Sequence, residues 1–168
     1  MAAKTGTYTL IGSATVGTTG NNVTLSSIPS VYTDLILVMY ARRGIDGFGG
    51  DALKFQLNSD TGSNYALTEI SGNGSSAVTG RVTSGTNGFC GTANDGNYAT
   101  SIAHFMDYSN TTTYKSILSR RGGFSDQPVT ANVNLWRSTS AISSIYLYAT
   151  NGFYSGSTFK LYGIEAAK

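Results

Sequence analysis

The sequence has little that predicts helix. No stretch places apolar residues at i, i+3, i+4 and i+7 together with a helix cap and strong helix formers. Short runs of β-branched and aromatic residues recur instead, and clusters of Gly, Asn, Ser and Asp separate them. This pattern is typical of sandwiches and barrels. We therefore predict an all-β fold, an antiparallel two-sheet β-sandwich of jelly-roll type.

Charged residues are scarce too. They make up 12% of the chain, against about 25% in typical globular proteins. Gly, Ser, Thr and Asn together form roughly 45% of the sequence, so the surface is polar without being charged. The basic residues are scattered, in pairs at most, such as Arg42/Arg43 and Arg120/Arg121. A phosphate-binding face needs clustered Lys and Arg, so we expect no nucleic-acid partner.

Cysteine is nearly absent. The single Cys90 cannot close an intrachain disulfide, and no stretch has the Cys/His spacing of a zinc site. A chain of this length buries roughly 70% of the surface that its unfolded form exposes, which is enough for a core held together by packing. We therefore expect neither a metal nor another cofactor.

Long apolar runs are missing as well. No stretch approaches the ~20 apolar residues of a membrane helix, and Met1–Gly6 has no apolar run of the signal-peptide kind. We expect no membrane partner and synthesis in a cytoplasm. Residues 1–6, mostly small and carrying Lys4, are predicted to form an N-terminal arm, and residues 7–168 to form a single β-sandwich domain.

Strand signals run along the whole chain. The predicted strands are 6–16, 22–28, 34–42, 52–58, 64–71, 76–83, 99–108, 112–121, 129–137, 143–150 and 157–164. Two stretches rich in Gly and Asn, 44–50 and 84–97, are predicted to be long exposed loops because their residues tolerate positive φ.

Apolar and aromatic strand faces are the best candidates for binding. The run Leu35–Tyr40 is apolar on both faces, so we expect a central strand covered on both sides, either by a loop of this chain or by another subunit. Exposed tyrosines suit subunit interfaces and stacking on sugar rings. The candidate residues for contact with another subunit or a partner protein are Ile36, Val38, Tyr40, Tyr146, Tyr148, Tyr162 and Lys4.

Three motifs could carry chemistry. Asp60-Thr61-Gly62 spells the aspartic-protease triplet, but that mechanism needs two carboxylates and only one copy is present, so a β-turn is predicted. The alternating oxygens of residues 58–64, with Glu69 further on, leave a calcium loop as an alternative. His104 is the only histidine, and the chain lacks a G-x-S-x-G elbow. We predict no catalytic residue, no metal site and no enzyme.

Several segments together carry a family resemblance. They are Ser27-Ile28-Pro29 followed by Tyr32–Leu37, then Phe55–Tyr65, Gly72–Ser75 and Leu161–Ile164. In these segments the chain resembles a group of small virion proteins encoded by tailed bacteriophages, cyanophages among them. The resemblance implies a jelly-roll or related β-sandwich, commonly a trimer, that serves as a head decoration (cement) protein or as part of a tail or fibre.

The first functional expectation is therefore a capsid decoration protein. It would form a homotrimer on the outer surface of the virion, bind the major capsid protein and stabilise the head. The alternative is a tail or fibre module that binds a host glycan through aromatic residues and Asn-lined loops. A carbohydrate-active enzyme is a third expectation from another class, and it would need two carboxylates at catalytic separation.

Deletion of residues 1–6 tests the predicted arm. An arm that contacts a neighbouring subunit contributes to attachment and not to the domain core. We expect the melting temperature to stay nearly unchanged while binding to decoration-free heads becomes weaker. Unchanged affinity for the heads would remove the arm from the mechanism.

Overall fold

The computed structural model describes residues 7–44, 51–93, 96–122 and 128–165. The predicted arm with Lys4, and residues 45–50 of the first predicted loop, lie outside these ranges. The described part contains no helix and is built from strands joined by turns. The strands are β1 (Tyr8–Thr15), β2 (Val23–Leu25), β3 (Asp34–Ala41), β4 (Asp51–Leu57), β5 (Tyr65–Gly72), β6 (Ala77–Gly85), β7 (Gly88–Ala93), β8 (Ala99–Phe105), β9 (Lys115–Arg121), β10 (Val129–Trp136), β11 (Ile145–Tyr148) and β12 (Thr158–Ile164).

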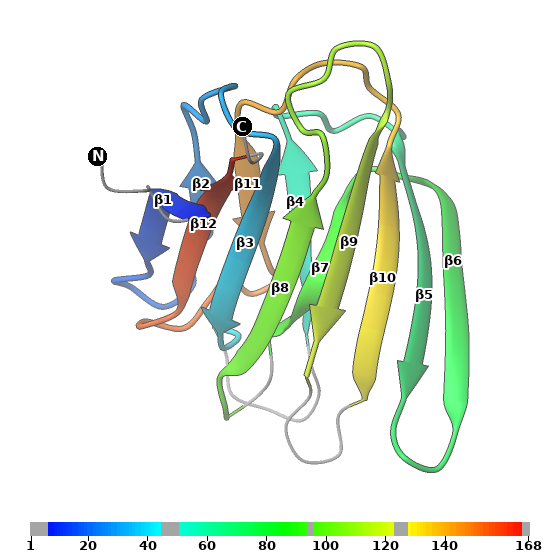
Figure 1. The fold of residues 1–168 in the computed structure, drawn as a ribbon. Helices are drawn as coiled ribbons and strands as arrows, with labels where there is room; N and C mark the ends of the chain where they lie inside the picture. The colour runs from blue at the N-terminus through cyan, green and yellow to red at the C-terminus, as the bar shows by residue number, and fades with distance from the viewer. Residues whose placement is uncertain (1–6, 45–50, 94–95, 123–127, 166–168) are drawn as a thin grey trace.

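The strands form two antiparallel sheets of unequal width. The large sheet has eight strands in the order β1-β12-β3-β8-β9-β10-β5-β6, and the small sheet has four in the order β2-β11-β4-β7. Figure 1 looks onto the large sheet, with the small sheet behind it. The predicted all-β two-sheet sandwich is confirmed.

Alternation along the strands divides the large sheet into two faces. In β3, Leu35, Leu37 and Met39 are fully buried and point toward the small sheet. Ile36 and Val38, on the opposite face, are half-buried, and no described segment of the chain lies over them. We call the face turned away from the small sheet the outer face.

A cluster of aromatic residues fills the centre of the sandwich. Phe55 contacts Tyr65 and Phe105 edge-on, with ring centroids 6.2 and 5.7 Å apart. Gly88 lies directly under the Phe55 ring, where a Cβ atom would be 2.0 Å from the ring carbon Cζ. Glycine is therefore required at Gly88 for the Phe55 ring to lie over β7, the neighbouring strand of the same sheet.

The predicted loop 84–97 is wrong in part, because residues Gly88–Ala93 form β7. This strand is the edge of the small sheet, and Cys90 within it is fully buried. Asn134 of β10 holds the strand in place: its side-chain oxygen accepts from Phe89 N at 2.8 Å, and its amide nitrogen donates to Phe89 O at 2.9 Å. The Asn134 side chain thus makes the backbone hydrogen bonds that a neighbouring strand would make at this edge.

The turn around Asp60 is fixed by hydrogen bonds to one carboxylate. Trp136 Nε1 donates to Asp60 at 2.7 Å, Asn64 Nδ2 at 2.9 Å and the backbone N–H of Gly62 at 2.8 Å. Burial works to raise the pKa of Asp60, but these hydrogen bonds together lower it below its ordinary value of 3.8. The turn predicted for residues 60–62 is therefore a structural junction between the β4–β5 connection and β10.

Replacing Asp60 by Asn tests this junction. The amide keeps the shape but loses the charge that strengthens three hydrogen bonds, so we expect a loss of about 1–2 kcal/mol in the free energy of unfolding at pH 7. A carboxylate whose pKa is lowered on folding stabilises the protein above its ordinary pKa of 3.8, and the stabilisation is lost as the pH falls through the lower folded value.

Denaturant unfolding between pH 7 and pH 2 provides the measurement. The wild-type protein should lose more stability than Asp60→Asn as the pH falls below about 4. Glu165→Gln, which removes an exposed carboxylate, serves as the matched control. Parallel pH profiles for the wild type and Asp60→Asn would contradict the role given to this carboxylate.

Candidate functional site

The outer face of the large sheet carries apolar side chains on neighbouring strands. Strand registers place one row of cross-strand neighbours across the whole sheet, from β1 to β6. The row consists of Leu10, Tyr162, Ile36, His104, Leu118, Val133, Thr68 and Arg81. Since aligned side chains on one face of a sheet touch their cross-strand partners, this row is a continuous surface.

A second row runs beside the first. It contains Lys160, Val38, Ile102, Arg120, Ala131, Ile70 and Thr79, from β12 to β6. Several apolar residues of the outer face stay well exposed, among them Leu118 at 42%, Val133 at 51% and Ile70 at 56%. Singly exposed apolar residues are ordinary, but a contiguous group of them marks an interaction surface.

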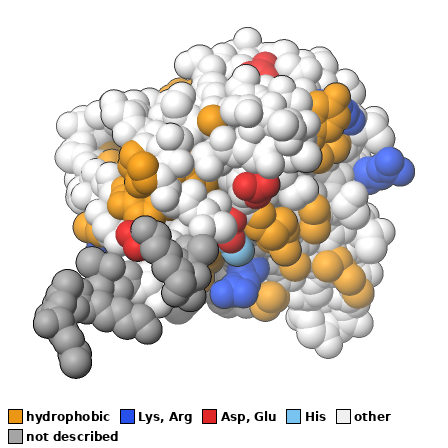
Figure 2. Space-filling model, turned by 45° about the horizontal axis from the view of Figure 1, so that its top comes forward, with side chains coloured by type: hydrophobic (Ala, Val, Ile, Leu, Met, Phe, Trp, Pro, Cys, Tyr) orange, Lys and Arg blue, Asp and Glu red, His pale blue; other side chains and the backbone are white. Residues whose placement is uncertain are grey.

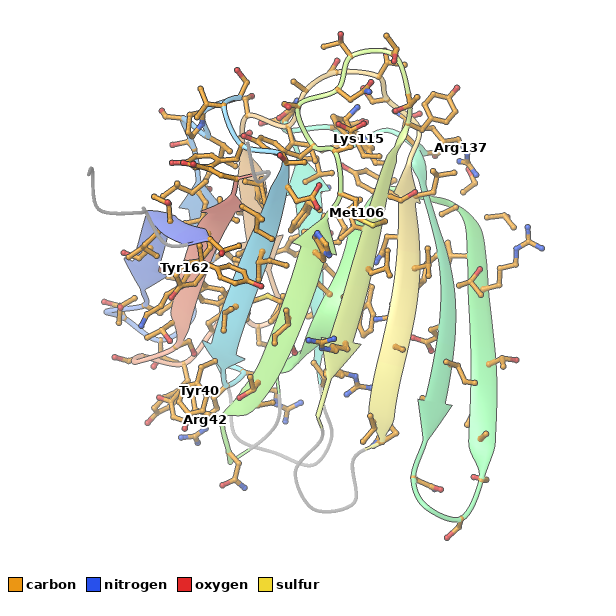
Figure 3. All side chains as sticks on the ribbon, viewed as in Figure 1. Tyr40, Arg42, Met106, Lys115, Arg137 and Tyr162 are labelled. Carbon is orange, nitrogen blue, oxygen red and sulfur yellow. The ribbon has the colours of Figure 1, made fainter. Side chains whose placement is uncertain are left out.

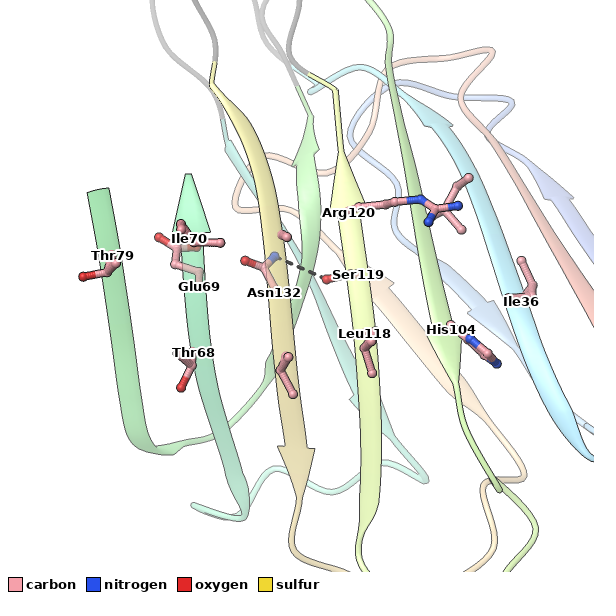
Figure 4. A pocket seen from close by; sticks show the side chains of 13 residues that line it. Ile36, Thr68, Glu69, Ile70, Thr79, His104, Leu118, Ser119, Arg120 and Asn132 are labelled. Carbon is pink, nitrogen blue, oxygen red and sulfur yellow. Dashed lines mark hydrogen bonds between the residues drawn. The ribbon is translucent and has the colours of Figure 1, made fainter. Parts of the chain in front are cut away.

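The two rows enclose a hollow of about 530 Å³. Its apolar lining comes from five strands, and Thr68, Thr79, His104 and Arg120 stand among the apolar side chains (Figure 4). The main apolar lining residues are Ile36, Ile70, Ile102, Leu118, Ala131 and Val133. A mostly apolar concavity with a few polar groups is the usual composition of a binding site.

His104 stands at this hollow with a carboxylate beside it. Its Nε2 lies 2.9 Å from Asp34 Oδ2, and the other Asp34 oxygen accepts the backbone N–H of Asp107 at 2.7 Å. No partner of His104 is apparent from the sequence, because Asp34 and His104 lie 70 residues apart and meet only across the β3–β8 ladder. Figure 2 shows the histidine beside hydrophobic side chains on the surface.

Cations dominate the charge of the outer face. Arg81, Arg120 and Lys160 are exposed there, whereas Asp34 is paired with His104. In Figure 4 the Arg120 side chain extends from β9 toward β8. The outer face therefore combines an apolar centre with positive groups, and it suits a partner surface that is apolar and acidic.

The structure divides the predicted contact residues between two surfaces. Ile36, Val38, Tyr40 and Tyr162 share the outer face of the large sheet. Tyr146 and Tyr148 belong to β11, and they point away from the core on the small sheet, at the opposite side of the sandwich. One flat partner therefore cannot contact all of them at once.

Tyr146 and Tyr148 form an aromatic platform on the small sheet. Their rings stack with centroids 5.3 Å apart, Lys54 Nζ lies 5.9 Å from the Tyr148 ring centroid, and Asn22 Nδ2 donates to the Tyr146 hydroxyl at 3.1 Å. Burial, and secondarily the neighbouring Tyr146, raise the pKa of Tyr148. The platform thus offers an aromatic surface edged by hydrogen-bonding groups.

A second aromatic cluster, at the end of β3, is not predictable from the sequence. Tyr40 stacks on Tyr98 with centroids 4.7 Å apart, and Tyr98 donates from its hydroxyl to Ser155 O at 2.7 Å. The Arg42 guanidinium lies 3.9 Å from the Tyr154 ring centroid. Figure 3 places Tyr40 and Arg42 together at this end of the sheet. The members come from distant parts of the chain and share no sequence pattern.

The calcium alternative is not favoured by the geometry of residues 58–64. The Asp60 carboxylate accepts three N–H groups, and Asn58 Oδ1 accepts the backbone N–H groups of Ser143 and Ser144. These oxygens accept hydrogen bonds from N–H groups, whereas the oxygens of a cation site point at the metal ion. Among the described residues, no group of three or more His, Cys, Asp or Glu side chains is placed to hold a metal ion.

The segments that carry the family resemblance build the fold. Tyr108 donates from its hydroxyl to Pro29 O, and the Tyr32 ring covers Gly163, where a Cβ atom would be 2.3 Å from that ring. The segment from Phe55 to Tyr65 supplies the central aromatic contacts and the Asp60 turn. The segments that carry the resemblance therefore contain residues that stabilise the fold.

No helix in the part of the chain that the structure describes is long and apolar enough to cross a membrane. Comparison with known proteins gives no relative: no family model, no curated protein and no solved structure matches this chain.

Proposed function

We propose that the protein is a structural component of a bacteriophage virion, a capsid decoration protein that works by binding and carries out no reaction. It attaches to the outer surface of the head through the outer face of its large sheet and so stabilises neighbouring capsid subunits. The observation that carries the proposal is the continuous apolar outer face, which no described segment of the chain covers.

The energetics favour a protein partner for this surface. Burying apolar area contributes roughly 25 cal/mol per Å², so a face that spans several strands provides binding energy without any chemistry. Arg81, Arg120 and Lys160 add electrostatic attraction for acidic groups at the edges of the contact. The major capsid protein is the partner we propose, and the family resemblance is the support for placing the protein on a virion.

A homotrimer is the assembly we propose for the free protein. Ile36, Val38, Tyr40 and Tyr162 lie together toward the β1 side of the outer face, and this part of the face provides the subunit contacts. The exposed apolar residues toward β10 and β5 then remain for the capsid.

The connectivity also supports the jelly-roll fold that we propose. When the hairpins β5–β6 and β9–β10 are set aside, the remaining strands change sheet at every step along the chain except from β4 to β7, which are neighbours in the small sheet. Their spatial orders are then β1-β12-β3-β8 and β2-β11-β4-β7. Two four-stranded sheets built by such crossings are the pattern of a jelly roll, with the two hairpins as additions that widen one sheet.

Glycan binding within a tail or fibre is the second candidate function. The stacked pair Tyr146 and Tyr148, with Lys54 and Asn22 at its edge, favours it. Sugar rings stack on such aromatic surfaces, and amide and ammonium groups bond to their hydroxyls. This platform lies on the small sheet, so its variants separate the two functions.

Leu118→Glu tests the outer face. The new carboxylate would be buried against an apolar and acidic partner, and we expect at least about 100-fold weaker binding to decoration-free heads, equal to nearly 3 kcal/mol. Because Leu118 is already 42% exposed, the circular dichroism spectrum and melting temperature should stay unchanged.

Two matched variants complete the test. Thr24→Glu places the same charge on an exposed position of the small sheet and should bind heads as the wild type does. Tyr148→Ala should likewise keep head binding. If Leu118→Glu binds heads normally, the proposal is overturned. If Tyr148→Ala instead abolishes adsorption to a host-glycan array, glycan binding becomes the function.

A further inference from the structure

The edge strand β6 has a longer regular ladder than the other sheet edges. The strand β2 has three residues, and the ladders of β1 and β7 are interrupted by register shifts at Leu10/Gly12 and Leu53/Lys54. The β5–β6 ladder also has a register shift, between Tyr65 and Leu67, but it is regular from Ala77 to Val82. Long regular edges bind other strands unless they are blocked.

The hairpin β5–β6 also extends beyond the small sheet. In Figure 1, β6 lies at the end of the large sheet remote from β1, and the small sheet does not reach it. Most residues of β6 are exposed on both faces. Val78 is 61% exposed and Val82 is 45% exposed, and both point to the side of the small sheet, opposite to the outer face.

The backbone groups that face outward can be assigned from the turn. Asn73 N–H donates to Ser76 O at 3.2 Å and closes the hairpin. Antiparallel partners alternate between pairs that exchange hydrogen bonds and pairs that do not. Counting from the turn, the N–H and C=O groups of Ala77, Thr79 and Arg81 therefore point away from β5.

The sequence of β6 is self-complementary about Gly80. In an antiparallel pair of two β6 strands centred on Gly80, Val78 lies opposite Val82 of the partner subunit, and Thr79 lies opposite Arg81 of the partner subunit. The outward-facing groups of Thr79 and Arg81 then meet as hydrogen-bonded pairs. At the two-fold axis glycine faces glycine, so β6 itself has no side chain there. The Glu69 side chain of β5 occupies the space beside Gly80, with Oε1 3.0 Å from the position that a Cβ atom of Gly80 would take.

The two neighbouring symmetric registers of a β6–β6 pair give less favourable contacts. Centring the pair on Arg81 places two arginines directly opposite each other, which is destabilising. Centring it on Thr79 places Val78 opposite glycine, so the valine contacts are lost. Only the Gly80 register joins hydrogen bonds, valine pairs and separated charges.

We propose that β6 binds β6 of a second copy of this chain about a two-fold axis through Gly80, which joins the two large sheets into one. The contact buries Val78 and Val82 on the side opposite to the outer face, so it leaves the outer face free. It is independent of the proposed decoration function. In combination with a trimer, it links copies that belong to different trimers.

The double variant Val78→Cys/Val82→Cys reads the register directly. In the Gly80 register each new cysteine lies opposite the other cysteine of the second copy, in a pair whose Cα atoms are about 4.5 Å apart, within disulfide range. The two positions are too far apart along one strand to bond within a chain. Mild oxidation should give a covalent dimer, and Cys90 is buried and should not react.

Single variants are the matched controls. Val78→Cys alone and Val82→Cys alone place each cysteine opposite a valine, so both should remain monomeric on non-reducing gels. A cross-link formed equally by a single variant, or none by the double variant, would overturn the register. Leu118→Glu, which tests the outer face, should not affect this cross-link, so failure of one proposal is distinguishable from failure of the other.

Thr79→Pro tests the same contact without cysteines. Proline is tolerated at an outward-facing edge position, where it removes one N–H from the proposed ladder but none from the ladder with β5. Sedimentation at high protein concentration should give the wild type and Thr79→Val twice the mass of Thr79→Pro. Val82→Lys, which cannot disturb the backbone, should match Thr79→Pro. Equal masses for all four proteins would overturn the proposal.

Discussion

The unequal width of the two sheets is the constraint on which the rest of this structure depends. A four-stranded sheet covers only part of one face of an eight-stranded sheet, because strand spacing is similar in both, about 4.8 Å. The inner face of the large sheet is therefore apolar beneath the small sheet. Toward its uncovered end, on β9 and β10, it becomes polar, with Ser119, Asn132 and Asn134 buried there. Beyond them the small sheet covers only the start of the hairpin β5–β6, where Tyr65 is buried against Phe55, and most of β6 is exposed.

Hydrogen bonds hold the two sheets together at the edge of the apolar core. Asn134 and Ser119 bind the backbone of Phe89 and so hold the edge of the small sheet against the large one. The hydrogen bond from Trp136 to Asp60 joins the β4–β5 connection to β10, the strand that also carries Asn134. These polar contacts lie at the boundary of the aromatic core, where an unpaired donor or acceptor would cost about 1–3 kcal/mol. They fix the small sheet in position and leave the far side of the large sheet open.

The two open surfaces differ in chemistry, which is why they suit different partners. The outer face has an apolar centre, a hollow and exposed cations. The small sheet presents stacked tyrosines with amide and ammonium groups beside them. The edge of β6 offers neither of these, but a row of backbone groups and two valines. The three surfaces point in separate directions, so a partner on one of them would leave the other two free.

The sequence by itself determined the all-β class, most strands and the inward or outward direction of their side chains, because alternation is a local property of each strand. Alternation places Ile36, Val38 and Tyr40 on one face of their strand, and Tyr146 and Tyr148 on one face of theirs. The sequence-based prediction failed at β7, because Gly88 and Gly91 give this strand the composition of a loop. Those glycines are needed because Phe55 and Ser101 occupy the space of their side chains. Only the tertiary structure decided the pairing of His104 with Asp34, the hollow and the uncovered edge at β6, since strand order joins residues that are distant along the chain.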